Sequence, residues 1–398
     1  MCKPVPRTAL MVCPQFRPIV GGYERSAEAL SAWMAVRGMR VTVVTERRSR
    51  DWPRVERLSG FEIRRLPSLY VKGVHILSTL VSLACFLLVR GRRFAVWHVH
   101  QYGWYGGVAI GMGRLLRRPV VLKITNQREY GIAAVAAGAF GSSILTRLLA
   151  AANACVVISR ETRDEALAFG YPPDRIVTVP NGVDGTIFQP STPEARVEQR
   201  AALGLAARGI VLSVARMYPE KNIRGLIEAW ALVAAKAEGW VLVVLGDGPL
   251  RPDIEKAIRD YGVSSSVRLI GQVAVPAPWF RASDVFVLSS HAEGLSNTTL
   301  EAMASGLPVV STRVSGSHET VKRTGAGLVV DVADMPALAA ALLRLIGDAA
   351  ERARMGAAAR RAFDQSFSIE TVGERMLSLY AALTTQGRAA TWEPPCAV

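Results

Sequence analysis

The stretch DVFVLSSHAEGLSNTTLEAMASGLPVVSTRVSG, residues 284–316, carries the signals that decide the fold. Residues 285–288 form a short apolar run, which is typical of a strand buried on both faces of a parallel sheet. A polar loop follows, and residues 297–301 then indicate a helix start. Gly306 and Pro308 end that helix, and a second apolar run follows at once. The stretch therefore predicts a strand–loop–helix–strand unit of the α/β class.

Two glutamates, Glu293 and Glu301, lie where such a unit binds ligands. Ligands of open parallel sheets sit beyond the carboxyl ends of the strands, where a helix N-terminus offers amide donors to an anion. Glu293 falls on the loop and Glu301 about one turn into the helix, so both carboxylates can accept hydrogen bonds from sugar or ribose hydroxyls. The plain alternative is that Thr298 and Glu301 form a T-x-x-E capping box and that Glu293 is a solvated loop acid.

Residues 293–310, EGLSNTTLEAMASGLPVV, strongly resemble the donor-site signature of the family 4 retaining glycosyltransferases. The length of 398 residues already favours two domains over a single core. The resemblance extends from about residue 8 to residue 383 and implies the GT-B architecture, in which two Rossmann-like, doubly wound α/β domains face a central cleft. It implies an acceptor-binding domain at 1–190, a nucleotide-sugar domain at 191–366, and a helix that crosses back, with a tail, at 367–398.

Two segments of the first half also resemble the family. The sequence GGYE, which begins at Gly21 and Gly22, opens a helix pattern, and the resemblance places these glycines against the donor diphosphate or the acceptor and Glu24 at the acceptor. A plain tight turn is the alternative, because the full G-x-G-x-x-G is missing. The run FAVWHVH ends a strand with His98 and His100, whose i, i+2 spacing predicts that both side chains share one face. The resemblance places His100 near the donor sugar; a structural histidine is the alternative.

Lys123 interrupts the apolar run VVLKIT at residues 120–125, which predicts a strand. It is an acceptor-binding candidate, because its ammonium could meet a phosphate. The alternative is that the side chain leaves the core and carries its charge to the solvent.

The segment RMYPEKN, residues 216–222, follows a predicted strand and resembles the family pattern V-G-R-x-x-x-x-K-G, with Arg216 and Lys221 retained. Two cations past a strand end can neutralise a diphosphate, Arg as a bidentate fork and Lys as a point charge. A salt bridge to Glu220 is the alternative.

The resemblance implies a complete set of site residues and no metal or other cofactor. The catalytic candidates are Arg216, Lys221, Glu293 and His100. The nucleotide candidates are Glu301, Gly246 and Gly271, and the candidates for the donor sugar and phosphates are Gly21, Gly22, Gly294, Leu295, Ser296, Asn297 and Thr298.

Basic charge is concentrated in the first half of the chain. Residues 1–190 hold 26 Lys and Arg against 12 Asp and Glu, a net charge of +14, whereas residues 191–398 hold 22 against 21. A basic half predicts an anionic partner or, equally, an Arg-rich solvated surface. The five cysteines are odd in number and lack C-x-x-C spacing, which suits a reducing cytosol. The start of the chain resembles a first strand more than a signal peptide.

The most apolar run, VHILSTLVSLACFLLV at residues 74–89, is followed by Arg90, Arg92 and Arg93. Sixteen residues are fewer than the roughly 20 that span a bilayer. A core helix is one interpretation, and an interfacial helix on the inner face of the plasma membrane is the other.

The predicted function is transfer of a sugar from a UDP- or GDP-linked donor to a glycan, lipid-linked or phosphorylated acceptor, in surface polysaccharide or glycolipid assembly. The protein is expected in the cytoplasm, with possible peripheral membrane contact and no nucleic-acid partner. Two alternatives stay open. One is a sugar-nucleotide epimerase of the same architecture, and the other is a non-enzymatic protein that binds anionic surfaces.

Overall fold

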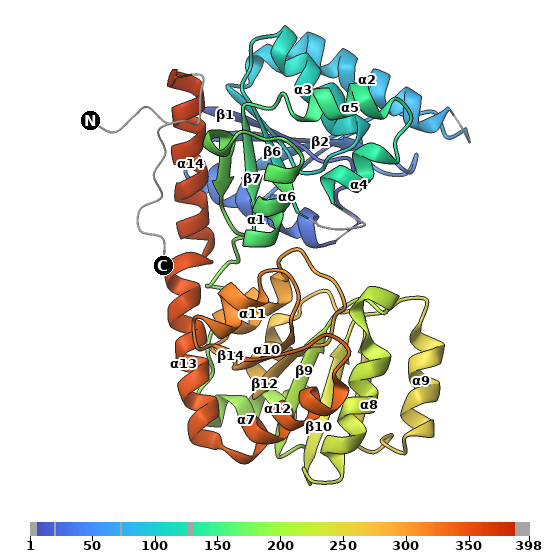
Figure 1. The fold of residues 1–398 in the computed structure, drawn as a ribbon, viewed down its shortest axis with the longest axis vertical. Helices are drawn as coiled ribbons and strands as arrows, with labels where there is room; N and C mark the ends of the chain where they lie inside the picture. Colours follow the sequence, from blue (N-terminus) through green and yellow to red (C-terminus); the bar gives the residue numbers. More distant parts are fainter. Residues whose placement is uncertain (1–5, 20, 72–73, 126–130, 387–398) are drawn as a thin grey trace. The chain divides into compact units, whose positions relative to one another are not determined.

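The computed structural model describes residues 6–19, 21–71, 74–125 and 131–386. Contacts between Cα atoms divide the chain into two compact units (Figure 1). Unit 1 is Met1–Gly182 with Ile369–Val398, and unit 2 is Val183–Ser368. The sequence placed the corresponding crossings at residues 190–191 and 366–367.

Unit 1 is built on an eight-stranded sheet with the order β3-β4-β2-β1-β5-β6-β7-β8. The strands are β1 (Thr8–Val12), β2 (Arg40–Glu46), β3 (Val55–Leu58), β4 (Phe61–Leu66), β5 (Val96–Val99), β6 (Val120–Ile124), β7 (Ala154–Val157) and β8 (Ile176–Thr178). Only the edge pair β3 and β4 is antiparallel; every other neighbouring pair is parallel. The chain runs outward from β1 in one direction and then from β5 in the other, so the topological switch point lies between β1 and β5.

Helices cover both faces of this sheet. They are α1 (Gly22–Val36), α2 (His75–Arg90), α3 (Trp104–Leu115), α4 (Ile132–Ala137), α5 (Ser142–Leu149), α6 (Arg160–Ala168) and α14 (Ile369–Gln386). Alternate residues of β1 enter two cores: Met11 packs with Trp33 of α1 and Leu379 of α14, and Leu10 packs with Ile110 of α3 on the other face. The doubly wound arrangement predicted for the first half is therefore confirmed.

Unit 2 contains a six-stranded, fully parallel sheet with the order β11-β10-β9-β12-β13-β14. The strands are β9 (Gly209–Val214), β10 (Trp240–Leu245), β11 (Val267–Gly271), β12 (Val285–Leu288), β13 (Val309–Thr312) and β14 (Gly327–Val330). The helices are α7 (Pro193–Ala202), α8 (Ile223–Ala234), α9 (Arg251–Asp260), α10 (Ala277–Ala282), α11 (Asn297–Ala304), α12 (Met335–Gly347) and α13 (Ala349–Ser366). Numbered within the unit, the strand order is 3-2-1-4-5-6, the Rossmann order, and its switch point lies between β9 and β12.

Helix α2 differs from the core helix considered from the sequence. Its buried side chains are Thr79, Leu83 and Leu87, whereas Ile76 and Val89 are 69% and 78% exposed. The core-helix interpretation is therefore wrong, because only one narrow face of α2 meets the rest of unit 1. The helical stretch His75–Arg93, at 19 residues and a mean hydropathy of 1.3, is long and apolar enough to cross a membrane by length and composition alone.

Candidate functional site

The switch point of unit 2 brings together the loops that follow β9 and β12. The amide of His291 donates to the Glu220 carbonyl oxygen at 2.8 Å, and the Ser289 hydroxyl donates to the Lys221 carbonyl oxygen at 3.1 Å. These bonds join two loops that are about 70 residues apart in the sequence. They hold the predicted catalytic cations of the first loop beside the predicted glutamate of the second.

Lys221 and Glu293 form the central contact of this site. The Nζ atom of Lys221 lies 2.8 Å from Oε1 of Glu293, and the Ser290 hydroxyl donates to the same oxygen at 2.8 Å. Their side chains are 16% and 13% exposed. Glu293 is therefore no solvated loop acid, and that alternative is wrong. The pair combines a cation that can meet a diphosphate with a carboxylate that can accept from sugar hydroxyls.

Arg216 lies at the same loop in a more open position. Its guanidinium is 3.7 Å from the Glu220 carboxylate and its side chain is 62% exposed. The guanidinium also lies over the Tyr218 ring, 4.8 Å from the centroid. The salt bridge that the sequence offered as an alternative thus exists, but an exposed pair at this distance contributes little to stability.

Helix α11 begins at Asn297, and Ser296 is its N-cap, because the Ser296 hydroxyl accepts from the Thr299 amide at 3.2 Å. The T-x-x-E capping box proposed for Thr298 and Glu301 is therefore wrong; the Thr298 hydroxyl instead lies 3.0 Å from that of Ser296. Glu301 is buried one turn into the helix. The expectation about its position is confirmed, while its role in holding ribose stays a prediction.

Glycines shape the other loops at this edge of unit 2. Gly246 follows β10 with φ +124°, and a Cβ there would lie 2.0 Å from the Ala215 carbonyl oxygen. Its amide donates to the carbonyl of Gly271, which has φ +88°. Both positions therefore need glycine for backbone reasons. Gly294 and Leu295 are buried in the loop before α11, and Ser296, Asn297 and Thr298 are half-buried.

In unit 1, the glycine pair opens α1 as predicted. Gly21 is the N-cap, and a Cβ on it would lie 2.5 Å from Oε2 of Glu24. Glu24 is buried, and its Oε1 accepts from the Gln15 side-chain amide at 2.8 Å. Nothing lies within 4 Å of a Cβ built on Gly22. The close packing of the Glu24 carboxylate explains Gly21, whereas Gly22 leaves open space in front of the helix.

His98 and His100 share one face, as the i, i+2 spacing predicts, and their rings stack with centroids 4.0 Å apart. Both are fully buried. Nδ1 of His98 lies 2.7 Å from the Tyr380 hydroxyl of α14. Neither ring nitrogen of His100 has a hydrogen-bond partner within the described residues. Burial, with the nearby Lys123 charge, lowers the pKa of both imidazoles, so both are neutral at physiological pH.

Lys123 is buried at 4% exposure, so the alternative that it reaches the solvent is wrong. Its Nζ donates to Oδ1 of Asn181 at 2.8 Å and to the Ser26 hydroxyl at 3.1 Å. Burial lowers the pKa of Lys123 to about 8. No carboxylate forms an ion pair with it among residues 6–19, 21–71, 74–125 and 131–386. A desolvated lysine beside two neutral oxygens is a candidate for binding an anion or giving up a proton.

The sequence did not identify the residues that form hydrogen bonds with Lys123 and His98. Ser26 and Asn181 lie 97 and 58 positions from Lys123, and Tyr380 lies 282 positions from His98. No group of three or more His, Cys, Asp or Glu that could hold a metal ion occurs in the described part of the chain.

Comparisons with known proteins agree with this geometry. The family description "Glycosyl transferase 4-like domain" matches residues 21–182, and "Glycosyl transferases group 1" matches residues 208–348. The two matches cover the predicted site segments of both units.

Curated relatives extend the likeness along the chain. A protein of Mycobacterium tuberculosis named GDP-mannose-dependent alpha-(1-6)-phosphatidylinositol monomannoside mannosyltransferase is 31% identical over 304 residues, which cover 72% of this chain and 77% of that protein. A D-inositol 3-phosphate glycosyltransferase of Thermomonospora curvata is 27% identical over 395 residues and 90% of each chain.

Solved structures share the fold. A sucrose-phosphate synthase from Thermosynechococcus elongatus has a TM-score of 0.80 at 23% identity and covers 95% of this chain and 99% of its own. Anabaena HepE in complex with UDP-glucose has a TM-score of 0.78 at 17% identity, with 94% of this chain and 100% of its own covered.

Proposed function

The chain belongs to the group 1 glycosyl transferases and is a glycosyltransferase, and we propose that it moves a hexose, with retention of the anomeric configuration, from a nucleotide diphosphate sugar to a lipid-linked or phosphorylated acceptor. The observation that carries the proposal is the contact of Lys221 with Glu293 at the switch point of unit 2. It places a phosphate-binding cation beside a carboxylate that accepts from hydroxyls, and a nucleotide sugar carries both partner groups.

The donor would replace both halves of this ion pair at once. Its diphosphate would accept from Lys221 while a sugar hydroxyl donates to Glu293, so neither partly buried charge is left without a partner. A ligand that carries only one of the two groups would leave the other charge unpaired. The site should therefore prefer an intact nucleotide sugar over free sugar or free pyrophosphate.

Catalysis in this proposal is electrostatic. Negative charge would develop on the diphosphate as the glycosidic bond breaks, and Lys221 and the more open Arg216 would stabilise that charge. No step needs a proton from either cation, and the two positive charges would supply the neutralisation that a metal ion supplies elsewhere. Metal independence is accordingly part of the proposal.

Unit 1 would receive the acceptor at the carboxyl ends of β1, β5 and β6. His100, Glu24 and Lys123 all lie at that edge. The relatives named for phosphatidylinositol monomannoside and for inositol 3-phosphate support an inositol-containing, phosphorylated acceptor. The relative named as GDP-mannose-dependent makes GDP-mannose the first donor to test, and the UDP-glucose complex of Anabaena HepE makes UDP-glucose the second.

The test is a transfer assay in the presence of a chelator. Purified protein is given GDP-mannose or UDP-glucose with phosphatidylinositol or inositol 3-phosphate, and products are identified by mass spectrometry and their sugar configuration by NMR. We expect one donor to give a glycosylated acceptor with the α configuration. Product formed without any acceptor would favour an epimerase, and no product with any combination would overturn the proposal.

A binding assay identifies the base independently. Thermal stabilisation is measured with GDP, UDP, ADP and TDP for the wild type and for Glu301→Ala. We expect one nucleotide to stabilise the wild type and Glu301→Ala to weaken its binding by about 1–3 kcal/mol, the usual loss for a charge-assisted hydrogen bond. Unchanged affinity in Glu301→Ala would remove Glu301 from the donor site.

We also propose that unit 1 attaches to an anionic membrane surface through α2, at the cytoplasmic face. The exposed apolar residues of α2 include Ile76, Leu77 and Val89, and the exposed Arg92 and Arg93 follow its end. An apolar face with cationic residues at one end suits insertion beside anionic headgroups. Flotation with phosphatidylglycerol vesicles should fall in Leu77→Ser and persist in Val55→Ser, which alters an exposed valine of β3. Equal flotation of both variants would contradict this attachment.

A further inference from the structure

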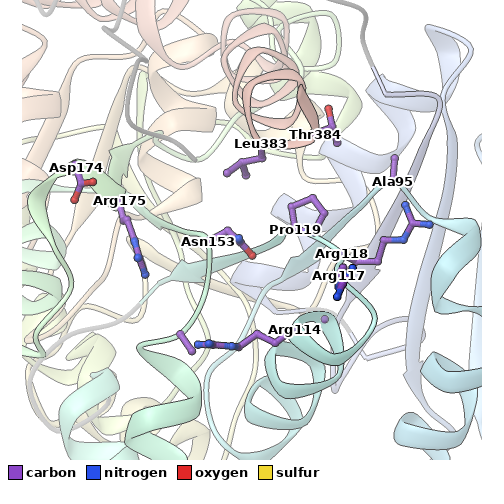
Figure 2. Close-up of a pocket in the computed structure, with 12 residues that line it drawn as sticks. Ala95, Arg114, Arg117, Arg118, Pro119, Asn153, Asp174, Arg175, Leu383 and Thr384 are labelled. Carbon is purple, nitrogen blue, oxygen red and sulfur yellow. The ribbon is translucent and has the colours of Figure 1, made fainter. Parts of the chain in front are cut away.

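Unit 1 carries a second concave site at the amino ends of its strands. The predicted acceptor residues lie toward the carboxyl ends of the strands, on the opposite side of the sheet's length. The cavity has a volume of about 740 Å³ and lies where β5, β6, β7 and β8 begin (Figure 2). Its lining comprises Ala95, Gly113, Arg114, Arg117, Arg118, Pro119, Ala151, Asn153, Asp174, Arg175, Leu383 and Thr384. The candidate site residues of unit 1, Glu24, His100 and Lys123, lie toward the carboxyl ends of the strands, about one strand length away, which is roughly 13–17 Å for strands of this size.

Four arginines face this cavity with a single acid, Asp174. Arg114, Arg117 and Arg118 come from the end of α3, and Arg175 lies just before β8. None of the four forms an ion pair within the parts of the chain that the structure describes. The Nε atom of Arg118 is buried without a hydrogen-bond partner there. The lining therefore combines an excess of positive charge with a guanidinium donor that the protein itself leaves unsatisfied.

Arg117 stands at a position where the backbone favours glycine. It follows α3 with φ +55°, and its amide and that of Arg118 donate to the carbonyls of Arg114 and Gly113, which closes the helix. Glycine is the usual residue in the left-handed conformation that ends a helix in this way. An arginine here adds a guanidinium to the cavity, although its left-handed φ makes the backbone less stable than a glycine would. This indicates that the guanidinium has a function in the cavity.

A polar side chain, that of Asn153, completes the lining. Asn153 accepts from the Val120 amide through Oδ1 at 2.9 Å, so its amide NH₂ group remains as a donor beside the arginines. In the view of Figure 2, Asn153 and Pro119 lie between Arg175 on one side and Arg117 and Arg118 on the other, with Arg114 below them. Planar guanidinium groups bind phosphate oxygens through paired hydrogen bonds, and their charge persists at every physiological pH.

We propose that this arginine cavity binds a phosphate-bearing anion, separately from the donor and acceptor sites. The anion accepts from the unpaired guanidinium groups and from the Asn153 amide. The phosphate comes either from a free phosphorylated metabolite or from a phospholipid headgroup. This site does not depend on the transfer reaction, because its residues lie at the amino ends of the strands and the predicted acceptor residues lie toward the carboxyl ends.

The test measures binding of inorganic pyrophosphate by titration calorimetry at constant ionic strength. Arg118→Gln and Arg175→Gln should each weaken binding about tenfold, the loss expected for one charge-assisted hydrogen bond. Arg117→Gly should weaken it as well, although this variant relieves the left-handed arginine and should melt no lower than the wild type. Arg57→Gln on β3, an exposed arginine at the far edge of the sheet, is the charge-matched control and should bind normally.

The donor site needs its own control, because it too is expected to attract a diphosphate. Pyrophosphate binding that persists in Lys221→Ala and falls in Arg118→Gln belongs to the arginine cavity. The opposite result is pyrophosphate binding that falls in Lys221→Ala, while the affinities of Arg118→Gln and Arg175→Gln equal that of the control Arg57→Gln. That result would overturn the proposal for a free phosphate ligand. Neither result requires a working transfer assay. The arginine-cavity proposal is therefore tested independently of the proposed function.

A vesicle arm distinguishes the source of the phosphate. Flotation is compared on phosphatidylcholine vesicles with and without phosphatidylglycerol. Loss of flotation in Arg117→Gly and Arg175→Gln, with pyrophosphate ineffective, assigns the cavity to a headgroup. Pyrophosphate binding with unchanged flotation assigns it to a soluble ligand. If the cavity variants match Arg57→Gln in both arms, the cavity binds no phosphate and the proposal is wrong.

Discussion

Lys123 in unit 1 and Lys221 in unit 2 are both lysines at a sheet edge where a ligand is expected, yet they meet opposite surroundings. Lys221 is partly exposed and paired with the Glu293 carboxylate. Lys123 is buried beside the neutral oxygens of Ser26 and Asn181, and its pKa is lowered to about 8. A lysine near the carboxyl ends of a sheet therefore has no fixed chemistry. Lys221 is paired with a carboxylate where an anion is expected, and burial prepares Lys123 to lose its proton.

The largest expected effect tests the charged member of this comparison. Lys221→Ala should lower kcat by about 10²–10³-fold, the loss typical of one preorganised group that stabilises developing charge. KM for the donor should change less, because most of the contribution of Lys221 arises as the diphosphate departs. Steady-state kinetics with the donor that the transfer assay identifies measures both parameters.

Lys256→Ala provides the matched control, because Lys256 also pairs with a carboxylate, that of Asp260 at 2.6 Å, but on the exposed surface of α9. Its kcat should equal that of the wild type. A Lys221→Ala enzyme with normal kcat would show that the contact of Lys221 with Glu293 is structural only, and the contrast between the two lysines would lose its meaning for catalysis.

The next effect concerns the pH dependence of stability that Lys123 should create. The pKa of Lys123 is about 8 in the folded protein against a usual value of 10.5. Between these values the unfolded chain holds a proton that the folded chain has released, so the free energy of unfolding should rise with pH across this window. The full rise is about 3 kcal/mol. Below pH 8 this contribution is absent, because both states carry the proton.

Lys123→Met isolates that contribution, because methionine has similar volume and no charge. The difference in urea unfolding free energy between wild type and Lys123→Met should grow in favour of the wild type from pH 8 to pH 10.5. Lys236, an exposed lysine of unit 2, gives the control Lys236→Met, whose difference should be flat. A flat difference for Lys123→Met would mean that Lys123 keeps an ordinary proton affinity.

The smallest effect concerns Tyr380, the hydrogen-bond partner of the buried His98. Tyr380→Phe removes the hydroxyl that lies 2.7 Å from Nδ1 of His98. Because this leaves a buried imidazole nitrogen without its partner, we expect a loss of about 1–2 kcal/mol in unfolding free energy. Thermal or urea unfolding measures it.

Tyr70→Phe is the comparison for Tyr380→Phe, since the Tyr70 hydroxyl donates to the Arg47 carbonyl at 2.6 Å in an exposed position. Water can replace that bond, so this variant should lose much less. Equal losses of unfolding free energy in the two variants would indicate that burial does not strengthen the contribution of the Tyr380–His98 hydrogen bond to stability.

The sequence predicts the site of unit 2 better than that of unit 1, for a physical reason. Arg216, Lys221 and Glu293 follow strands in short loops, so local pattern and strand order suffice to bring them to one edge. Lys123 depends on Asn181 and Ser26, which are 58 and 97 positions away in the sequence and meet it only through the tertiary fold. No periodicity encodes contacts of that separation.

Two local errors have similar causes. Thr298 and Glu301 fit the T-x-x-E pattern, but the hydroxyl of Ser296 caps α11 through Thr299, because the loop enters the helix two residues earlier. Hydrophobicity alone also favoured a core position for α2, although its composition fits burial in protein and exposure to lipid equally well. Propensity identified both elements, and tertiary surroundings decided how each is used.

The last helix has a consequence for how the protein is made. The chain of unit 1 is interrupted by residues 183–368, so a ribosome completes all of unit 2 before it releases α14. Until then Trp33 lacks the close contact of Gly373, where a Cβ would lie 2.4 Å from the indole ring, and Met11 lacks its neighbour Leu379. A transcript truncated shortly before residue 369 should therefore yield a folded second unit joined to a first unit with a bare apolar face. We expect proteases and chaperones to recognise such a product, because the apolar face that α14 covers is exposed.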